Sequence, residues 1–254
     1  MSNIKLIIEY DGTNYAGWQV QNGSQKRTIQ EIIEKALQEI LQEKVKVTAS
    51  GRTDAGVHAL SQPANFKTRS RLSPVKIKDA LNALLPEDIA IKRVSRADED
   101  FNSCRSAKSK LYRYLILNSR LKSAFLCRHS WRVLHPLNLK LMQSEARVLR
   151  GRQDFKAFCA SGSSAKTTTR TIKKISVKSI RYQLSAISYP LIAIDIESDG
   201  FLYNMARNIA GTLVEIGRGR FKEGDLKKIL FSRDRRQAGP KAPSRGLFLA
   251  KVRY

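Results

Sequence analysis

A single carboxylate stands in the stretch SGRTDAGVH, which runs from Ser50 to His58. Asp54 is the only acidic residue in it, Arg52 precedes it by two positions, and two glycines permit a tight loop. An aspartate with a reference pKa of about 3.9 is ionised at neutral pH unless burial raises that value. Taken alone, Asp-Ala-Gly is more often an ordinary turn. Because the stretch combines a lone carboxylate, an arginine and two glycines in a loop between strand-like segments, it is nevertheless where we place the chemistry.

The first half of the chain predicts the order β-α-β-β-α-β around that loop. A strand ends at the turn Asp11-Gly12, a capping box at Thr28 begins an amphipathic helix, and Ser73-Pro74 begins a second helix. The expected strands are 4–10, 45–49, 62–68 and 89–94, and the first helix ends at Leu41. This order is typical of a split-βαβ fold, an antiparallel sheet with both helices on one face.

The second half predicts a similar order without obvious residue identity to the first. We expect strands at 111–117, 169–180, 191–197 and 247–252, and helices at 138–149, 202–216 and 225–231. The predicted fold class is therefore α+β, with two ferredoxin-like (split-βαβ, RRM-like) domains. Residues 1–103 form a catalytic-loop domain and residues 104–254 a basic domain, with antiparallel sheets packed around a central active-site cleft.

The charge of the chain points to a polyanionic partner. Lys and Arg number 47 against 22 Asp and Glu, a formal net charge of +25. The excess is uneven, because residues 1–103 carry 15 basic and 13 acidic side chains and residues 104–254 carry 32 and 9. Phosphate neutralisation makes nucleic acid the leading candidate, with most of the docking surface in the second half.

The three cysteines, Cys104, Cys127 and Cys159, show no paired spacing, so we predict reduced thiols and no metal site. Cys127 lies near His129 and His135, but this spacing fits no closed four-ligand pattern. The start of the chain has no signal-peptide pattern and no apolar run could span a bilayer. We expect a cytoplasmic protein without a membrane partner.

Several motifs together resemble one enzyme family. They are DGTNYAGWQ from Asp11, GRTDAGVHAL from Gly51, LNALLP from Leu81, KLYRY from Lys110, FLYNMARNIAG from Phe201 and AGPKAPSRGL from Ala238. In this combination the chain resembles tRNA pseudouridine synthase A, the TruA family, over nearly its whole length. The motif GRTDAGVHA is highly specific, whereas the others would be weak alone.

The resemblance implies isomerisation of uridine to pseudouridine at positions 38–40 of the tRNA anticodon stem-loop. It implies no cofactor, no metal and a homodimer. It also implies that Asp54 is the nucleophile, acting on a flipped base. Whether the carboxylate attacks C1′ or starts a glycal route stays open.

The resemblance assigns roles to three further residues. Arg52 would contact the phosphate backbone or fill the gap left by the flipped base, and from its position we expect it to hold Asp54 charged. Tyr112 would stack on the target uracil, although a core strand aromatic is the simpler interpretation, and it fits Tyr114 better. Arg207 would pair with the catalytic aspartate, although it lies on a helix where a plain surface charge is possible. We expect His58 to support the loop structurally.

Two positions depart from the family pattern, Cys104 and Lys241, of which Lys241 replaces a residue that is usually small and polar. Cys104 stands where the family typically has arginine, and Arg105 follows one residue later, where a strand would point it to the opposite face. Three rival functions are weighed: a non-catalytic RNA-binding module of doubled RRM-like topology, a methyltransferase and a base-excising glycosylase. The first lacks the RNP1 aromatic signature, the second lacks a glycine-rich loop after its first strand, and the third would release uracil.

Overall fold

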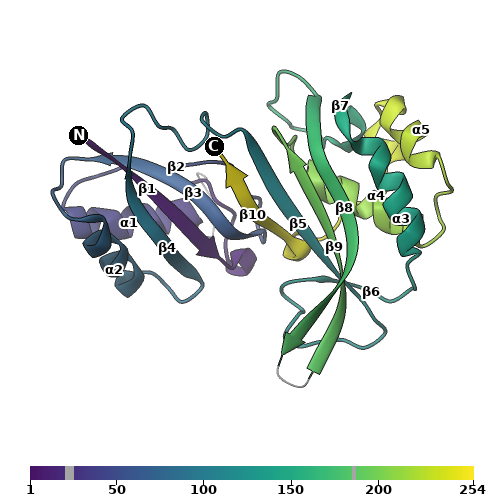
Figure 1. The fold of residues 1–254 in the computed structure, drawn as a ribbon. Helices are drawn as coiled ribbons and strands as arrows, with labels where there is room; N and C mark the ends of the chain where they lie inside the picture. The colour runs from purple at the N-terminus through teal and green to yellow at the C-terminus, as the bar shows by residue number, and fades with distance from the viewer. Residues whose placement is uncertain (21–25, 185–186) are drawn as a thin grey trace. The chain divides into compact units, whose positions relative to one another are not determined.

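The computed structural model describes residues 1–20, 26–184 and 187–254. Its chain divides into two compact units, drawn in Figure 1. Unit 1 comprises Met1–Lys108 with Phe248–Tyr254, and unit 2 comprises Ser109–Leu247. Both combine helices with β-sheet, so the predicted mixed α+β class is confirmed. Within the described residues, none of the helices has the length and apolar character to cross a membrane.

Unit 1 is a sheet with two helices on one face (Figure 1). Its strands run in the order β4-β1-β3-β10, with β2 paired to β3. The strands are β1 (Ser2–Tyr10), β2 (Thr48–Ala49), β3 (His58–Thr68), β4 (Ile89–Ala97) and β10 (Leu247–Arg253). Strand β1 is antiparallel to both β3 and β4, whereas β10 pairs with β3 in parallel. The predicted element order of the first half is confirmed.

Local sequence accounts for both helices of unit 1. In α1 (Ile29–Leu41), the Thr28 side chain accepts a hydrogen bond from the Glu31 amide, as the predicted capping box requires. In α2 (Pro74–Leu84), Ser73 caps the helix in the same way and proline occupies its first turn. The core of the unit is fully buried where these helices meet the sheet. It includes Ile29, Ile33, Leu37, Ile77, Leu81, Leu6 and Ile8.

The strands that flank the Asp54 loop differ from the prediction. Strand β2 is shorter than the expected 45–49, because the Val47 amide donates to Glu34 Oε1 of α1 (2.8 Å) and not to a neighbouring strand. Strand β3 begins at His58, four residues earlier than expected, because His58 and Ala59 pair with Phe248 on β10 and its neighbour. The loop therefore passes directly into a paired strand.

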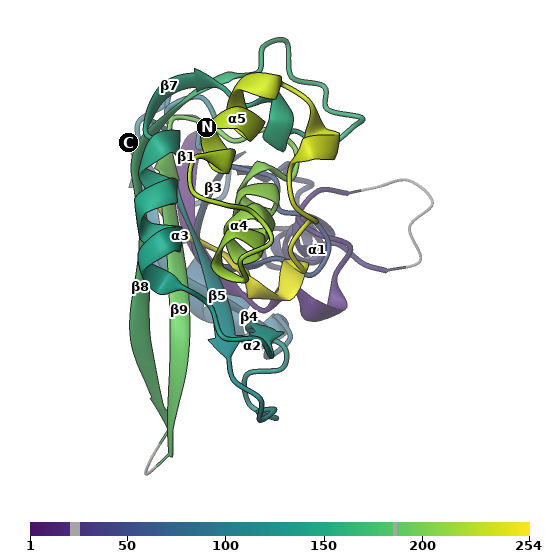
Figure 2. The same ribbon diagram turned by 90° about the vertical axis from the view of Figure 1, so that its right-hand side faces the viewer.

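Unit 2 also combines hydrogen-bonded strands with helices packed against them, as Figure 2 shows. Its strands run β5-β9-β8-β7, with β6 parallel to β5. They are β5 (Ser109–Asn118), β6 (Trp131–Val133), β7 (Gly151–Asp154), β8 (Thr169–Leu184) and β9 (Ile187–Ser198). The helices are α3 (Leu139–Ala146), α4 (Met205–Gly217) and α5 (Asp225–Ser232). Each strand and helix expected in this half is present, with shifted ends and with β6 and β7 added.

The predicted ranges 1–103 and 104–254 differ from the compact units in two places, at the boundary near residue 104 and at the end of the chain. Unit 1 continues to Lys108, whose amide donates to the carbonyl of Arg253 on β10. The last seven residues of the chain belong with unit 1 because β10 pairs with β3. Such a return of the chain terminus has no local signature, because it depends on a pairing between residues 190 positions apart.

Candidate active site

The Asp54 loop is held by backbone contacts with residues 11–18, the loop that follows β1. Asp54 is half-buried and forms an isolated β-bridge with Gly17. The Trp18 amide donates to the carbonyl of Thr53 (3.0 Å), and the Thr53 hydroxyl lies 2.7 Å from that of Tyr10. These contacts fix the backbone on both sides of the carboxylate.

Close approach of the two loops explains two glycines of the motif DGTNYAGWQ. Gly17 has φ +103°, and a Cβ there would lie 2.5 Å from the Thr53 carbonyl oxygen. At Gly12 a Cβ would lie 2.0 Å from the carbonyl oxygen of Val57. Any larger residue would push the 11–18 loop away from the Asp54 loop.

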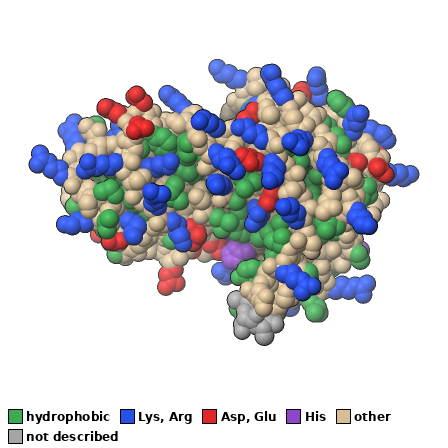
Figure 3. Space-filling view, in the orientation of Figure 1, with side chains coloured by type: hydrophobic (Ala, Val, Ile, Leu, Met, Phe, Trp, Pro, Cys, Tyr) green, Lys and Arg blue, Asp and Glu red, His purple; other side chains and the backbone are tan. Residues whose placement is uncertain are grey.

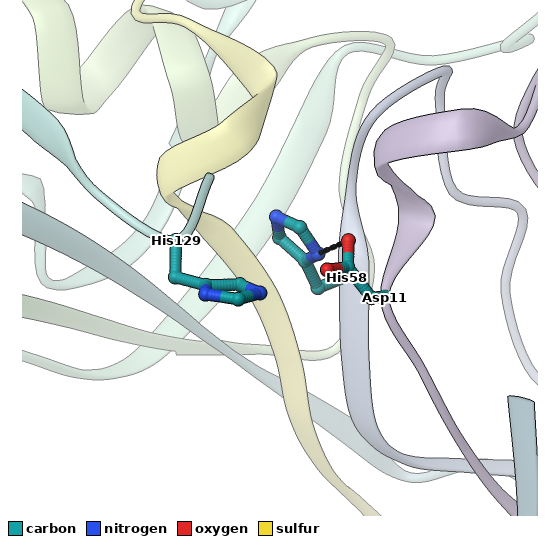
Figure 4. Close-up of side chains that lie close together, drawn as sticks. All are labelled: Asp11, His58 and His129. Carbon is teal, nitrogen blue, oxygen red and sulfur yellow. Dashed lines mark ion pairs between the residues drawn. The ribbon is translucent and has the colours of Figure 1, made fainter. Parts of the chain in front are cut away.

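His58 ties the same two loops through one ring nitrogen (Figure 4). Its Nδ1 lies 3.1 Å from the Gly12 amide nitrogen and 3.0 Å from Asp11 Oδ1. Without a proton, Nδ1 accepts from the Gly12 N–H, and with one it donates to the Asp11 carboxylate. The ring is 1% exposed and stacks on Phe248 with a centroid distance of 4.7 Å. These contacts suit the structural support expected of His58.

Arg52 lies in the same loop with its side chain exposed to solvent. Within the described part of the chain, no ion pair within 4.0 Å joins Arg52 to Asp54, so the structure lends no support to our expectation that Arg52 holds the carboxylate charged. Its exposure leaves the guanidinium accessible to a phosphate. The predicted RNA contact stays a prediction.

Tyr112 lies on β5 of unit 2 and is 8% exposed. Its ring meets that of Phe201 edge-on, with a centroid distance of 4.8 Å. Tyr114, two residues further along the strand, is 1% exposed and its hydroxyl donates to the Pro243 carbonyl (2.8 Å). Burial raises the pKa of Tyr114 and the charge of Arg207 opposes that rise. The core interpretation thus fits Tyr114, as expected.

Arg207 is half-buried and anchored at two atoms. Its Nε donates to the Ala242 carbonyl (2.8 Å) and its Nη1 to Asn204 Oδ1 (3.0 Å). The Ala242 amide in turn donates to the carbonyl of Arg207. A plain surface charge on a helix would have neither anchor, so the guanidinium is oriented within unit 2. Its pairing with Asp54 stays a prediction.

Sequence reasoning missed the residues that orient Arg207. Asn204 adopts φ +59° immediately before α4, a conformation that asparagine tolerates better than most residues. Residues 238–243 lie directly on α4, since a Cβ at Gly211 would be 1.7 Å from the carbonyl oxygen of Pro240. The joint presence of ARNIAG and AGPKAP in the sequence was the available signal for this contact.

The region around Cys104 differs from the expected strand. Residues 103–106 form a turn in which Asn102 Oδ1 accepts hydrogen bonds from the amides of Cys104 and Arg105 (both 3.0 Å). Both side chains are exposed. Cys104 and Arg105 therefore lie in a turn and not in the strand on which the expected opposite orientation depended, and strand alternation does not apply there.

The predicted site residues thus fall into two groups. Arg52 and Asp54 share one loop of unit 1, and Tyr112 and Arg207 lie on β5 and α4 of unit 2. A family model described as tRNA pseudouridine synthase matches residues 6–105 and 146–254, which include Arg52, Asp54 and Arg207 but not Tyr112. The chain belongs to the tRNA pseudouridine synthase family.

Individual relatives agree with this assignment. A protein named tRNA pseudouridine synthase A from Acetivibrio thermocellus is 45% identical over 254 residues, covering all of both chains. Proteins with the same name from Caldicellulosiruptor saccharolyticus and Thermoanaerobacter sp. are 45% and 41% identical over the same length, again covering all of both chains. The chain is therefore an isomerase of a family that converts uridine in tRNA.

Membership of this family does not favour the rival interpretation of the chain as a non-catalytic RNA-binding module. The contacts on the sheet of unit 1 give a physical reason against that interpretation. In an RRM, bases stack on aromatic side chains of the open sheet face. Here Asn3 on that face binds the carbonyls of Asp98 and Phe101 (both 2.8 Å). The Lys5 ammonium lies over the rings of Phe101 and Tyr254, 4.5 and 4.1 Å from their centroids. Asp98, Phe101 and Tyr254 thus lie on the sheet face on which an RRM would stack RNA bases.

Proposed function

We propose that this enzyme forms pseudouridine at positions 38–40 of the tRNA anticodon stem-loop, with Asp54 as nucleophile on a flipped uridine. The supporting observation is the immobilised Asp54 backbone, bridged to Gly17 and held at Thr53 by Trp18. A carboxylate on a rigid backbone is positioned for attack without further ordering. The site of modification rests on the resemblance of the motifs to the TruA family.

The reaction conserves all atoms of the nucleotide. The glycosidic bond from C1′ to N1 breaks, the uracil rotates while held, and C5 bonds to C1′. The proton on C5 is then lost and N1 gains one. Asp54 assists the first step, either by attack at C1′ or by starting a glycal route. Tyr112 is proposed to stack on the uracil, Arg207 to pair with the carboxylate and Arg52 to contact RNA.

The composition of unit 2 supports tRNA as the partner. On the face shown in Figure 3, Lys and Arg side chains of this unit clearly outnumber Asp and Glu. We also propose that both units are split-βαβ domains and that the protein is a cytoplasmic homodimer, as the resemblance implies. Light scattering behind a sizing column measures the dimer directly.

The decisive experiment compares wild type with Asp54→Asn on tRNA labelled with tritium at uridine C5. We expect tritium release and mapped pseudouridine in the anticodon stem-loop for wild type only, with tRNA affinity within about threefold in both proteins. Loss of the nucleophile removes the covalent route, so the expected rate loss is at least about 10³-fold. Full activity of Asp54→Asn, checked by mass spectrometry for deamidation, would reject the mechanism. Pseudouridine at other positions would reject the site assignment.

A further inference from the structure

Unit 1 has a basic hollow far from the Asp54 loop. It has a volume of about 550 Å³ and lies where β1 begins and β3 ends. Its lining contains three arginines, Arg69, Arg71 and Arg96, together with Ser2, Thr68 and Ser70. Three arginines in one hollow are unexpected in a half of the chain whose first 103 residues have almost balanced charge.

The backbone that carries two of these arginines is fixed by its own hydrogen bonds. Thr68 is 1% exposed, and its hydroxyl donates to Glu43 and accepts from the Ser70 amide. The Arg69 amide also donates to Glu43 Oε1 (3.0 Å), and the Leu72 amide donates to Ser70 Oγ (3.2 Å). Arg69 and Arg71 therefore project from an ordered connection between β3 and α2.

Strand pairing places the third arginine beside them. Arg96 on β4 lies opposite Ile4 of β1, and Ser2 of β1 lies opposite Thr68 of β3. The acidic run 98–100 follows β4 directly, but it crosses the other face of the sheet, where Asn3 binds the Asp98 carbonyl. The adjacent strand ends thus bring Arg96 to the hollow.

The positive charge of the hollow is largely uncompensated. Among the residues that the structure describes, no carboxylate lies within 4.0 Å of the guanidinium groups of Arg69, Arg71 or Arg96. Glu43 interacts electrostatically with Arg69, but its carboxylate is already bonded to the Thr68 hydroxyl and to the Arg69 amide. Three like charges side by side repel one another, which an anionic ligand would relieve.

We propose that this hollow binds the phosphate backbone of tRNA, outside the Asp54 loop. Arginine forks match phosphate oxygens two at a time, and the lining hydroxyls of Ser2 and Ser70 are additional donors. The hollow lies at the Ser2 end of β1 and the Asp54 loop at the Tyr10 end, roughly 25 Å apart at the usual strand rise. The bound phosphates therefore belong to a part of the tRNA remote from the modified uridine. The proposal rests on tRNA being the substrate.

The test compares two triple variants with the same change in net charge. The first is Arg69→Gln/Arg71→Gln/Arg96→Gln. The matched control replaces Lys35, Lys78 and Lys92 by Gln, three lysines of unit 1 that already lie 2.8–3.6 Å from Glu31, Asp79 and Glu9. Affinity for full-length tRNA is measured by filter binding between 50 and 200 mM salt.

We expect the arginine variant to bind at least about tenfold more weakly at low salt, and its slope of log K against log salt to fall by about 2 to 3. The control should change by less than about threefold. Melting temperatures of both variants should match wild type, and turnover at saturating tRNA should be retained while KM rises. Equal binding by the two variants would overturn the proposal.

A small-anion site is the main alternative, and inorganic phosphate is its probe. If phosphate alone raises the melting temperature of wild type but not of the arginine variant, while tRNA affinity follows the control, the hollow binds small anions and the RNA proposal is wrong. A wild type that binds tRNA but forms no pseudouridine would contradict the proposed function, and the binding comparison would still decide this inference.

Discussion

Single side chains join the two loops on which the proposed chemistry depends. Asp11 and Gly12 lie in one loop, and His58 ends the other. Because a single nitrogen, Nδ1, makes both contacts, the position of that atom matters more than the acidity of the ring. Asparagine places a polar atom close to the position of Nδ1, whereas glutamine places one close to Nε2.

His58→Asn should therefore retain more activity than His58→Gln. We expect kcat to fall less than about tenfold for Asn and about 100-fold for Gln, because a small displacement of a nucleophile is that costly. The affinity for tRNA should be unchanged in both, and His135→Asn, at an exposed histidine, serves as control. A reversed order with a shifted pH–rate profile would assign proton transfer to Nε2 instead.

Among the elements, the 11–18 loop and the Asp54 loop act as one structural unit. Their contacts are mostly between backbone atoms, so substitutions act on them through space and backbone conformation. Gly17 and Gly151 have nearly equal φ angles, +103° and +101°, but a Cβ at Gly151 meets nothing within 4 Å. Alanine substitutions at these two positions therefore distinguish the effect of backbone strain from the effect of a collision with the Asp54 loop.

Both Gly17→Ala and Gly151→Ala should lose about 1–2 kcal/mol of stability from the backbone conformation. Only Gly17→Ala should also lose pseudouridine formation, by about 100-fold, because the added carbon displaces Thr53 and Asp54. Chemical denaturation and tritium release measure the two effects. Equal activity losses in both variants would show that the close approach does not control the site.

At the scale of the whole molecule, the charge asymmetry predicts docking mainly through unit 2, but the basic residues of that unit differ in role. Arg236 donates from Nε to Asp234 Oδ1 and from Nη2 to Oδ2. Arg235 donates to Asn208 Oδ1 (3.0 Å), and burial lowers its pKa. Lys173 and Lys174 on β8 are exposed. Charge alone does not distinguish these groups.

Lys173→Gln/Lys174→Gln should weaken tRNA binding by about three- to tenfold and lower the salt slope by about 1 to 2. Arg235→Gln should instead lower the melting temperature, because it leaves Asn208, which is 1% exposed, without a donor. Filter binding and thermal unfolding distinguish the two outcomes. If the slope of log K against log salt in the lysine variant were as steep as in wild type, the docking surface would lie elsewhere.

Local patterns were sufficient to predict the Asp54 loop, the helices and most strands of this protein. Capping at Thr28 and Ser73, strand alternation and the motif GRTDAGVHA act within a few residues of one another, so their physical causes are present in the sequence itself. The tertiary structure alone decided the pairing of β10 with β3, the turn at 103–106 and the arginine hollow. The pairing and the hollow depend on segments distant in sequence, whose meeting is set by the packing of the sheet and not by local preference. The turn has local hydrogen bonds to Asn102, but Ser103 within it is also bonded to Asn65 and Tyr254.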